Sequence, residues 1–209
     1  MIQRPDQRVA VFIDTQNLYH SAKHVHSAHV NFGSLVEIAV GSRQLVRAIA
    51  YVAKSKTGEE SAFFEAMLQS GIELKIKDVQ EFASGAKKAD WDVGMAVDAM
   101  ALAPKVDAIV LATGDGDFVP LVEYLKGHGV MCEVAAFAES TNQQLRETCD
   151  AFMDLSEEPE AFLMGSKTKR KRAPVAKKTA NSAKQSPATR KKTSKEDDDE
   201  SDRKIRITF

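Results

Sequence analysis

The sequence predicts an α/β fold built on a mostly parallel sheet, and three observations support that prediction. Short runs rich in β-branched residues alternate with longer segments up to about residue 160. In the longer segments, apolar residues recur at three- and four-residue spacing, which is typical of helices. The first run, Arg8–Ile13 (RVAVFI), is almost continuously apolar, as expected for a strand that is buried on both faces.

Six segments are predicted to be the strands of this sheet. In chain order they are Arg8–Ile13, Leu45–Ala53, Ile72–Ile76, Val106–Ala112, Val130–Phe137 and Ala151–Leu155. The fourth ends in the turn TGDGD, and the sixth is expected at an edge of the sheet. Apolar residues at helical spacing predict four helices between the strands. These are Gly58–Gln69, Trp91–Ala103, Phe118–Gly127 and Thr141–Asp150.

Charge is divided unevenly along the chain, although its 209 residues carry a net charge of only −1. Residues 1–165 hold 14 Lys and Arg against 24 Asp and Glu, whereas residues 166–209 hold 15 against 6. Apolar spacing is lost from Ser166 onward, so this segment cannot bury enough surface to offset its ordering entropy. We therefore predict a globular domain over 1–165, with its core at 8–155, and a disordered tail over 166–209.

The predicted tail is basic before it is acidic. Lys167–Lys195 contains 12 basic residues and no acidic one, and Glu196–Glu200 follows as an acidic block. The basic stretch could bind nucleic acid phosphates by releasing counterions. The same composition fits a tail that only confers solubility or neutralises itself, so the charge pattern leaves both functions open.

Composition argues against several classes of protein. No apolar run approaches the roughly 18 residues needed to span a bilayer, and Met1–Arg8 lacks the apolar region of a signal peptide. Cys132 and Cys149 are the only cysteines, too few for a disulfide framework or a four-cysteine zinc site. The expectation is a cytoplasmic protein that does not associate with membranes.

Carboxylates follow two of the predicted strands at the point where each strand ends. Asp14 comes directly after the first strand, and Asp115 and Asp117 lie in the turn after the fourth. In a parallel sheet, ligands bind beyond the carboxyl ends of the strands, so these side chains are candidates for a site. Helix capping alone would explain Asp14 or Asp117. Three carboxylates at one edge repel one another, however, and a cation is the usual means of offsetting that repulsion.

The predicted helix at Trp91–Ala103 carries two further aspartates. Asp92 and Asp98 are six residues apart, about 240° around a helix, so they cannot both face one site. Asp92 lies in the first turn and is the better placed to reach the edge of the sheet. Asp98 could instead bond neighbouring backbone or a nucleic acid base from the flank of the helix.

Four of these aspartates offer only carboxylate oxygens as ligands, a donor set that suits Mg²⁺ or Mn²⁺. They are Asp14, Asp92, Asp115 and Asp117. Such a cation polarises a phosphoryl oxygen and activates water for attack on phosphorus. Thr113 and Asn17 could orient that water or hold a carboxylate from behind.

Three motifs together resemble the NYN domain of the LabA-like group, a branch of the PIN-like nuclease superfamily. They are VAVFIDTQNLY (Val9–Tyr19), KKADWDVGMAVDAM (Lys87–Met100) and IVLATGDGDFVPLVEYLKGHGVMCEV (Ile109–Val134). Their order and spacing agree over approximately residues 8–155, so the resemblance covers the predicted domain and not the tail.

This resemblance implies a three-layer α/β/α sandwich of the PIN-like kind, an acidic pocket for a divalent cation, and a ribonuclease activity or a derived role with RNA. Carried over position by position, the acidic pocket of the family falls on the four aspartates named above, with Asn17 as their usual polar companion. Asp98 matches the second aspartate of the helix motif, and its role is open. The usual Ser of the glycine-rich turn is Thr113 here, which keeps the hydroxyl group.

Several basic and aromatic side chains have two interpretations each. Lys87 and Lys88 could contact a nucleic acid backbone, or they could lie in a simple exposed loop. Trp91 could stack on a base or contribute packing area to the core. Tyr19 and Phe82 are further candidates for base stacking.

Four histidines lie close together in the sequence and could offer nitrogen ligands to zinc. They are His20, His24, His26 and His29. No cysteine lies nearby to complete such a site, and a solvent-exposed helix and loop would explain the group equally well.

The sequence therefore favours a divalent-metal-dependent ribonuclease that acts on RNA, most simply single-stranded RNA, with the basic tail concentrating substrate near an acidic domain. The alternative is a non-catalytic RNA- or protein-binding regulator that keeps the fold. A haloacid dehalogenase-type phosphatase would need a second acid where Gln16 stands, and no G-x-G-x-x-G supports a dinucleotide-binding oxidoreductase. Such folds often dimerise at sheet edges, but nothing in the sequence defines the interface of a homodimer.

Overall fold

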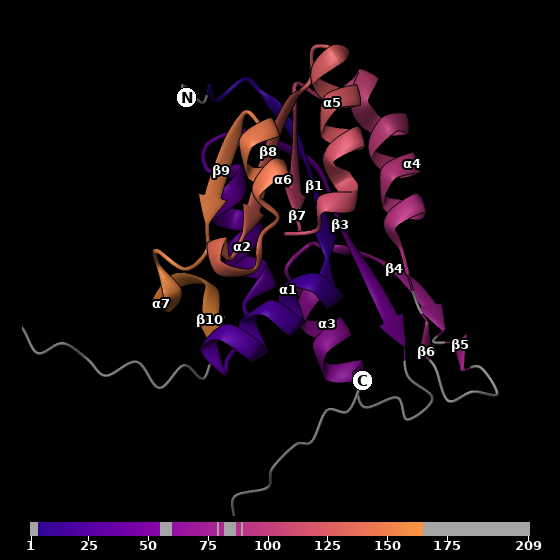
Figure 1. The fold of residues 1–209 in the computed structure, drawn as a ribbon, viewed down its shortest axis with the longest axis vertical. Coiled ribbons are helices and arrows are strands. Elements are labelled where there is room, and N and C mark those ends of the chain that lie inside the picture. The colour runs from indigo at the N-terminus through magenta and orange to yellow at the C-terminus, as the bar shows by residue number, and fades with distance from the viewer. Residues whose placement is uncertain (1–3, 55–59, 79, 82–86, 89, 165–209) are drawn as a thin grey trace, which may run out of the picture. The chain divides into compact units, whose positions relative to one another are not determined.

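Six parallel strands form the central sheet (Figure 1). The computed structural model describes residues 4–54, 60–78, 80–81, 87–88 and 90–164. The strands are β1 (Arg8–Asp14), β3 (Gln44–Lys54), β4 (Glu73–Asp78), β7 (Ala108–Ala112), β8 (Met131–Ala136) and β9 (Ala151–Asp154). Their order across the sheet is β4-β3-β1-β7-β8-β9, and every neighbouring pair is parallel. The predicted α/β class is confirmed, and β9 lies at an edge as expected.

Strand β1 lies near the centre of the sheet and is deeply buried. Val9–Ile13 are fully buried, because β3 and β7 flank the strand and helices cover both faces. Burial on both faces explains why its sequence does not alternate between apolar and polar residues. Strand β7 (AIVLA) is buried throughout for the same reason. Since β1 and β7 are parallel neighbours, their carboxyl ends reach the same edge of the sheet.

Helices on both faces of the sheet complete three layers. Helices α1 (Thr15–Ser21), α2 (Phe32–Val40) and α3 (Ser61–Gln69) lie on connections that run from β1 towards the β4 edge. Helices α4 (Asp92–Leu102), α5 (Val119–Gly127) and α6 (Gln143–Thr148) lie on connections that run the opposite way, from β4 to β9. Right-handed crossovers place the two sets on opposite faces. Figure 1 shows α4, α5 and α6 side by side. The expected three-layer α/β/α architecture is confirmed.

The ten predicted elements are all present, with ends that shift by at most three residues. Helices α1 and α2, however, are not among the predicted ones. Helix α1 leads into a short π-helical segment (Ala22–His26), and Asn31 caps α2 by accepting a hydrogen bond from the Ser34 backbone N–H at 3.2 Å. Gly33 and the β-branched residues of α2 lower its helix propensity, so packing against the sheet stabilises it.

Smaller elements complete the described chain. Strand β2 (His29–Val30) pairs with β10 (Leu163–Met164), β5 (Gln80–Glu81) pairs with β6 (Lys87–Lys88), and α7 (Pro159–Phe162) precedes β10. Phe82 and the predicted tail over 166–209 lie outside the described residues. In the part of the chain that the structure describes, no helix is long and apolar enough to span a bilayer.

A buried ion pair joins β8 to the end of α2. The Arg43 guanidinium binds the Glu133 carboxylate through two hydrogen bonds, of 2.6 and 2.9 Å. The Arg43 side chain also donates to the carbonyl oxygens of Ala39 and Val40 at the end of the helix, and the Val40 oxygen accepts the Arg43 backbone N–H as well. Both charged groups are buried, and these bonds offset the cost of removing them from water.

Candidate active site

Aspartates from three segments meet at the carboxyl edge of the sheet. Asp92 begins α4, and Asp115 and Asp117 lie in the turn after β7. Each offers a carboxylate oxygen, and these oxygens lie within 4.8 Å of one another. Among the described residues, this is the only group of three or more His, Cys, Asp or Glu side chains arranged to hold a metal ion. We call Asp92, Asp115 and Asp117, with Asp14 beside them, the acidic cluster.

Asp14 is the most firmly held of the four carboxylates. Its Oδ1 accepts a hydrogen bond from the Asn17 backbone N–H at 3.0 Å, and its Oδ2 accepts one from the Thr113 hydroxyl at 3.2 Å. The first bond caps α1, and the second joins β1 to the end of β7. Burial raises the pKa of Asp14, the bonds from Asn17 and Thr113 oppose that shift, and the charge of Asp115 adds to it.

The turn after β7 is stabilised by its own hydrogen bonds. Asp115 Oδ1 accepts a bond from the Asp117 backbone N–H at 3.0 Å, and the Asp115 N–H donates to the Thr113 hydroxyl oxygen at 3.2 Å. Asp115 is therefore the cap of the 3-10 turn Gly116–Phe118 that leads into α5. The prediction of Asp117 as a helix cap is wrong, because Asp117 already lies within the turn and its carboxylate is an exposed member of the cluster.

Two glycines let a neighbouring loop pack closely on this turn. A Cβ atom on Gly116 would lie 2.5 Å from Asn142 Nδ2, and one on Gly114 would lie 3.1 Å from the Thr141 Cα. The Asn142 N–H also donates to the Gly114 carbonyl oxygen at 2.9 Å. On the other side, Asn17 Oδ1 accepts a bond from the Gly114 N–H at 2.9 Å. The turn that carries Asp115 is thus bound to α1 and to the loop after β8.

Asp92 lies in a strongly acidic environment. Burial raises its pKa, and a side-chain hydrogen bond with Asp90 and the charges of Asp90, Asp14 and Asp115 raise it further, to about 7. Asp90 Oδ1 also accepts a hydrogen bond from the Asp92 backbone N–H at 2.9 Å. Asp90 is not among the residues predicted for the site, although the spacing of two aspartates around Trp91 is a sequence signal for it.

Asp98 lies outside the acidic cluster, on the flank of α4. Its Oδ2 accepts hydrogen bonds from the Tyr51 hydroxyl at 2.6 Å and from Lys75 Nζ at 2.5 Å. Partial burial opposes ionisation of Asp98, but the bonds from Lys75 and Tyr51 outweigh it, so its pKa is lowered. Tyr51 belongs to β3 and Lys75 to β4, so Asp98 joins α4 to the sheet through side chains. Its bonds are thus to side chains and not to the backbone, one of the partners considered from the sequence.

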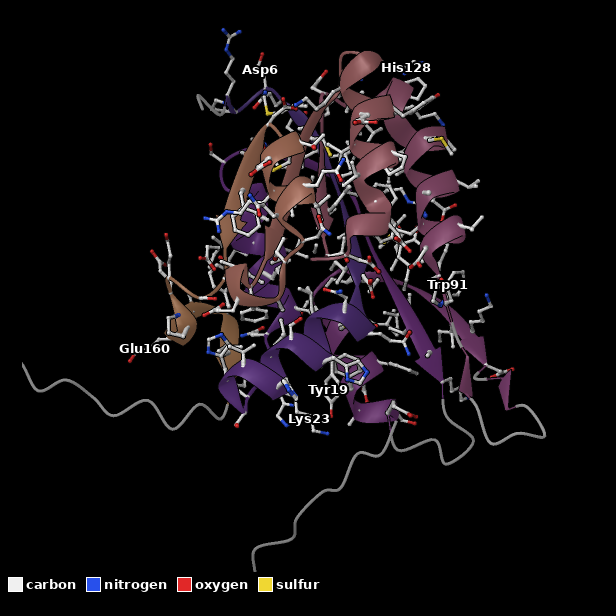
Figure 2. The ribbon with its side chains drawn as sticks, in the orientation of Figure 1. Asp6, Tyr19, Lys23, Trp91, His128 and Glu160 are labelled. Atoms are coloured by element: carbon white, nitrogen blue, oxygen red, sulfur yellow. The ribbon has the colours of Figure 1, made fainter. Side chains whose placement is uncertain are left out.

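The Trp91 side chain packs against the sheet and does not project freely beside the acidic cluster. Its Nε1 donates to the Val52 carbonyl oxygen at 3.0 Å, and its ring meets the Tyr51 ring edge-on with centroids 5.4 Å apart. Gly94 makes room for it, since a Cβ there would lie 2.8 Å from the indole. Lys77 Nζ lies 5.3 Å from the ring centroid. Of the two interpretations of Trp91, these contacts favour packing; Figure 2 labels it near the start of α4.

The remaining predicted side chains lie elsewhere. Lys87 and Lys88 form β6, ahead of α4 in the chain, and their side chains are not among the described groups. The histidines do not assemble as zinc ligands in the described part of the chain. His20 and His29 contact the Tyr19 ring, and His26 packs on a ring of the core.

A groove of about 550 Å³ extends from the acidic cluster between α4 and α5. Its acidic end is formed by Asp90, Asp92 and Asp117. Its walls are formed by apolar and aromatic side chains of the two helices and the turn before α5. These are Val93, Ala96, Met100, Phe118, Pro120, Leu121 and Tyr124.

The donor set of the acidic cluster fits a hard divalent cation. Two oxygens that bind one Mg²⁺ at about 2.1 Å lie no more than about 4.2 Å apart, so small rotations of the aspartate side chains from their present positions suffice. Burial raises the pKa of Asp92 and Asp14, the neighbouring carboxylates add to both shifts, and a positive charge among these groups relieves the repulsion.

Comparisons with known proteins show similarity in sequence and in fold. A family model described as the NYN domain matches residues 8–156. The chain is 25% identical over 169 residues to the Low amplitude and bright protein LabA of Synechococcus elongatus, which covers 75% of this chain and 88% of that protein. A crystal structure of a protein of unknown function from Vibrio parahaemolyticus superimposes with a TM-score of 0.70 at 28% identity, covering 78% of this chain and all of that one. The matched region contains every residue of the acidic cluster.

Proposed function

This chain belongs to the NYN domain family, and we therefore propose that it is a ribonuclease that hydrolyses phosphodiester bonds of single-stranded RNA with the help of Mg²⁺ or Mn²⁺. The observation that carries the proposal is the acidic cluster, in which Asp92, Asp115 and Asp117 offer oxygens within 4.8 Å of one another at the carboxyl edge of the sheet. Oxygen-only ligands of this kind suit the hard cations that assist phosphoryl chemistry.

The proposal gives the residues of the site different tasks. Asp92, Asp115 and Asp117 bind the cation, and Asp14 supports them from its buried position. When bound, the cation polarises a phosphoryl oxygen and activates water. Thr113 and Asn17 hold Asp14 and the turn after β7 in place through the hydrogen bonds described above.

The uneven distribution of charge along the chain supports a separate function for the predicted tail. Residues 1–165 are acidic overall, which opposes the approach of a polyanion, whereas residues 166–209 are basic overall. Within the proposal, the tail binds RNA phosphates and raises the substrate concentration near the acidic cluster.

The two cysteines, Cys132 and Cys149, are unpaired, which fits a reducing compartment such as the cytoplasm.

The central experiment measures cleavage of a labelled single-stranded RNA in Mn²⁺, in Mg²⁺ and in EDTA. Asp115→Asn is the informative variant, because it removes charge but keeps the oxygen that accepts the Asp117 N–H. Asp6→Asn, an exposed aspartate in the segment before β1, is the matched control. We expect metal-dependent cleavage that Asp115→Asn lowers at least a hundredfold and Asp6→Asn leaves unchanged, a loss typical of a group that acts on the transition state.

Cleavage that persists in EDTA or in Asp115→Asn would contradict the proposal. If wild type and Asp115→Asn are both inactive on several RNAs but bind them equally, the protein is instead a non-catalytic RNA-binding regulator. Deletion after Gly165 tests the tail separately. The truncated chain is expected to bind RNA more weakly and with a shallower dependence on salt, and unchanged affinity and salt dependence would exclude a role for the tail.

A further inference from the structure

We propose that the groove between α4 and α5 binds a nucleobase of the RNA whose phosphate lies at the acidic cluster. The proposal rests on the proposed ribonuclease function for its choice of ligand. The groove and the cluster share Asp92 and Asp117, so a ligand that reaches the aspartates with its phosphate lies at the entrance of the groove.

The size and chemistry of the groove fit a base better than a phosphate or a protein segment. Its volume of about 550 Å³ lies within the range of small-molecule sites, roughly 300–1,000 Å³. Beyond the aspartates at one end, its walls consist of apolar and aromatic side chains. Such walls accept the flat, uncharged face of a base and offer nothing to a second phosphate.

Tyr124 supplies an aromatic surface that is already held in position. Its ring stacks on the His128 ring, with centroids 4.0 Å apart and planes inclined by 30°. His128 Nδ1 also lies 2.7 Å from the Tyr124 carbonyl oxygen, which ties the imidazole to the end of α5. Tyr124 nevertheless lines the groove and keeps 41% of its surface exposed. An exposed aromatic ring fixed by a neighbour suits base stacking, because little side-chain freedom is lost on binding.

On the opposite wall, α4 extends the groove away from the aspartates. Asp92 and Met100 are eight residues apart on this helix, a distance of about 12 Å along its axis. Ala96 lies between them, and its small side chain leaves the middle of the groove open. The groove therefore extends from the aspartates for more than the width of one aromatic ring. Its apolar and aromatic walls predict stacking of a base without strong preference for one base over another.

The test compares two ligands that differ only in the base: adenosine 5′-monophosphate and ribose 5-phosphate, each titrated calorimetrically in Mn²⁺ and in EDTA. In Mn²⁺, wild type is expected to bind the nucleotide at least about tenfold more tightly, the effect of one stacked base. Tyr124→Ala and Ala96→Leu, which remove the stacking surface and fill the groove, are expected to reduce that ratio below about threefold. Tyr124→Phe keeps the aromatic ring and should keep the wild-type ratio of the two affinities. Val97→Ala is a control on α4, because the Val97 side chain is exposed and does not line the groove, and it should keep the ratio as well.

Equal affinity for the two ligands in wild type, or a ratio that neither Tyr124→Ala nor Ala96→Leu changes, would overturn the proposal. The same titrations test independently whether the acidic cluster binds a phosphate group through a metal ion. If ribose 5-phosphate gains nothing from Mn²⁺, the cluster is not a phosphate site, whereas a nucleotide preference lost in Tyr124→Ala would still support the groove. If wild type is a dimer in solution and Ala96→Arg makes it monomeric, a second copy of the chain covers the groove and the assignment to a base is wrong.

Discussion

Asn17 Oδ1 accepts a hydrogen bond from the Gly114 backbone N–H at 2.9 Å, and this bond joins the start of α1, next to Asp14, to the turn that carries Asp115. Asn17 belongs to α1, directly after β1, and Gly114 to the turn after β7. In the sequence Asn17 is only a polar companion of the first motif. In the structure it holds the start of α1 to the turn after β7, alongside the bond from the Thr113 hydroxyl to Asp14.

Replacing Asn17 with Ala should therefore affect both stability and metal binding. The variant leaves the Gly114 N–H without its partner, and we expect the free energy of unfolding to fall by about 1 kcal/mol. We expect Mn²⁺ affinity to fall about tenfold, as is common when a group that supports metal ligands is removed. Urea unfolding and Mn²⁺ titration measure the two effects. Asn17→Asp keeps an acceptor oxygen and should retain Mn²⁺ affinity; an equal loss in both variants would count against the hydrogen bond.

The raised pKa of Asp92 predicts how stability without metal depends on pH. Its pKa in the folded protein, about 7, lies above the ordinary value of 3.8, so the folded state holds the proton more tightly than the unfolded chain. Stability is therefore greatest below the ordinary value and is lost as the pH rises through the folded-state value.

Asp92→Asn should remove that loss. In EDTA we expect it to match wild type near pH 4 and to exceed its free energy of unfolding by about 1 kcal/mol near pH 8, allowing for solvent screening of a partly exposed group. Mn²⁺ should reverse the order near pH 8, because it stabilises the wild type by binding the folded state. Parallel pH profiles for the two proteins in EDTA would show that Asp92 is not the group responsible.

The bonds of Asp98 predict that the Tyr51 hydroxyl and Asp98 act as one unit. Asp98→Ala should lower the free energy of unfolding by about 2 kcal/mol, since it removes charge-assisted hydrogen bonds, and Tyr51→Phe should lower it by about 1 kcal/mol. Adding Tyr51→Phe to Asp98→Ala should cost little more than Asp98→Ala alone. A double-mutant cycle by urea unfolding measures that coupling, and strictly additive losses would mean that the two groups act independently.

The buried pair of Arg43 and Glu133 predicts a large asymmetry between single and double replacement. Glu133→Ala leaves the guanidinium buried without its carboxylate, and we expect a loss of about 3 to 5 kcal/mol in the free energy of unfolding. Arg43→Met combined with Glu133→Leu removes both charges and should recover much of that loss. Thermal unfolding compares wild type with these two variants, and a double variant less stable than Glu133→Ala would show that the ion pair itself stabilises the fold.

Much of the fold could be predicted because its strands and helices are locally marked. The apolar run Arg8–Ile13 and the turn after β7 identify strands by composition alone, and parallel geometry then places Asp14 and Asp115 at one edge. Local sequence patterns do not give the order of the strands across the sheet, so which strands are neighbours is known only from the structure. Helix α2 escaped prediction because Gly33 and β-branched residues obscure a helix that tertiary packing stabilises.

The candidate site divides in the same way. Helical periodicity separates Asp92 from Asp98, and the structure places the two on different sides of α4. Periodicity cannot supply the partners of Asp98, because Tyr51 and Lys75 come from distant segments. It also cannot show that Trp91 packs on Tyr51. Asp90 is a different case, since its spacing to Asp92 was visible and only the fold reveals that the two carboxyl groups interact.

The close packing of Asn142 on Gly116 links the residues at these two positions. Any side chain at 116 meets the Asn142 side chain, so a replacement there requires that side chain to rotate away, to be shortened or to move with its loop. Homologues are therefore expected to vary at these two positions in pairs. The same dependence matters for protein engineering. A change in the shape of the turn after β7 should begin with a substitution at position 142, on a loop that contributes no aspartate to the acidic cluster.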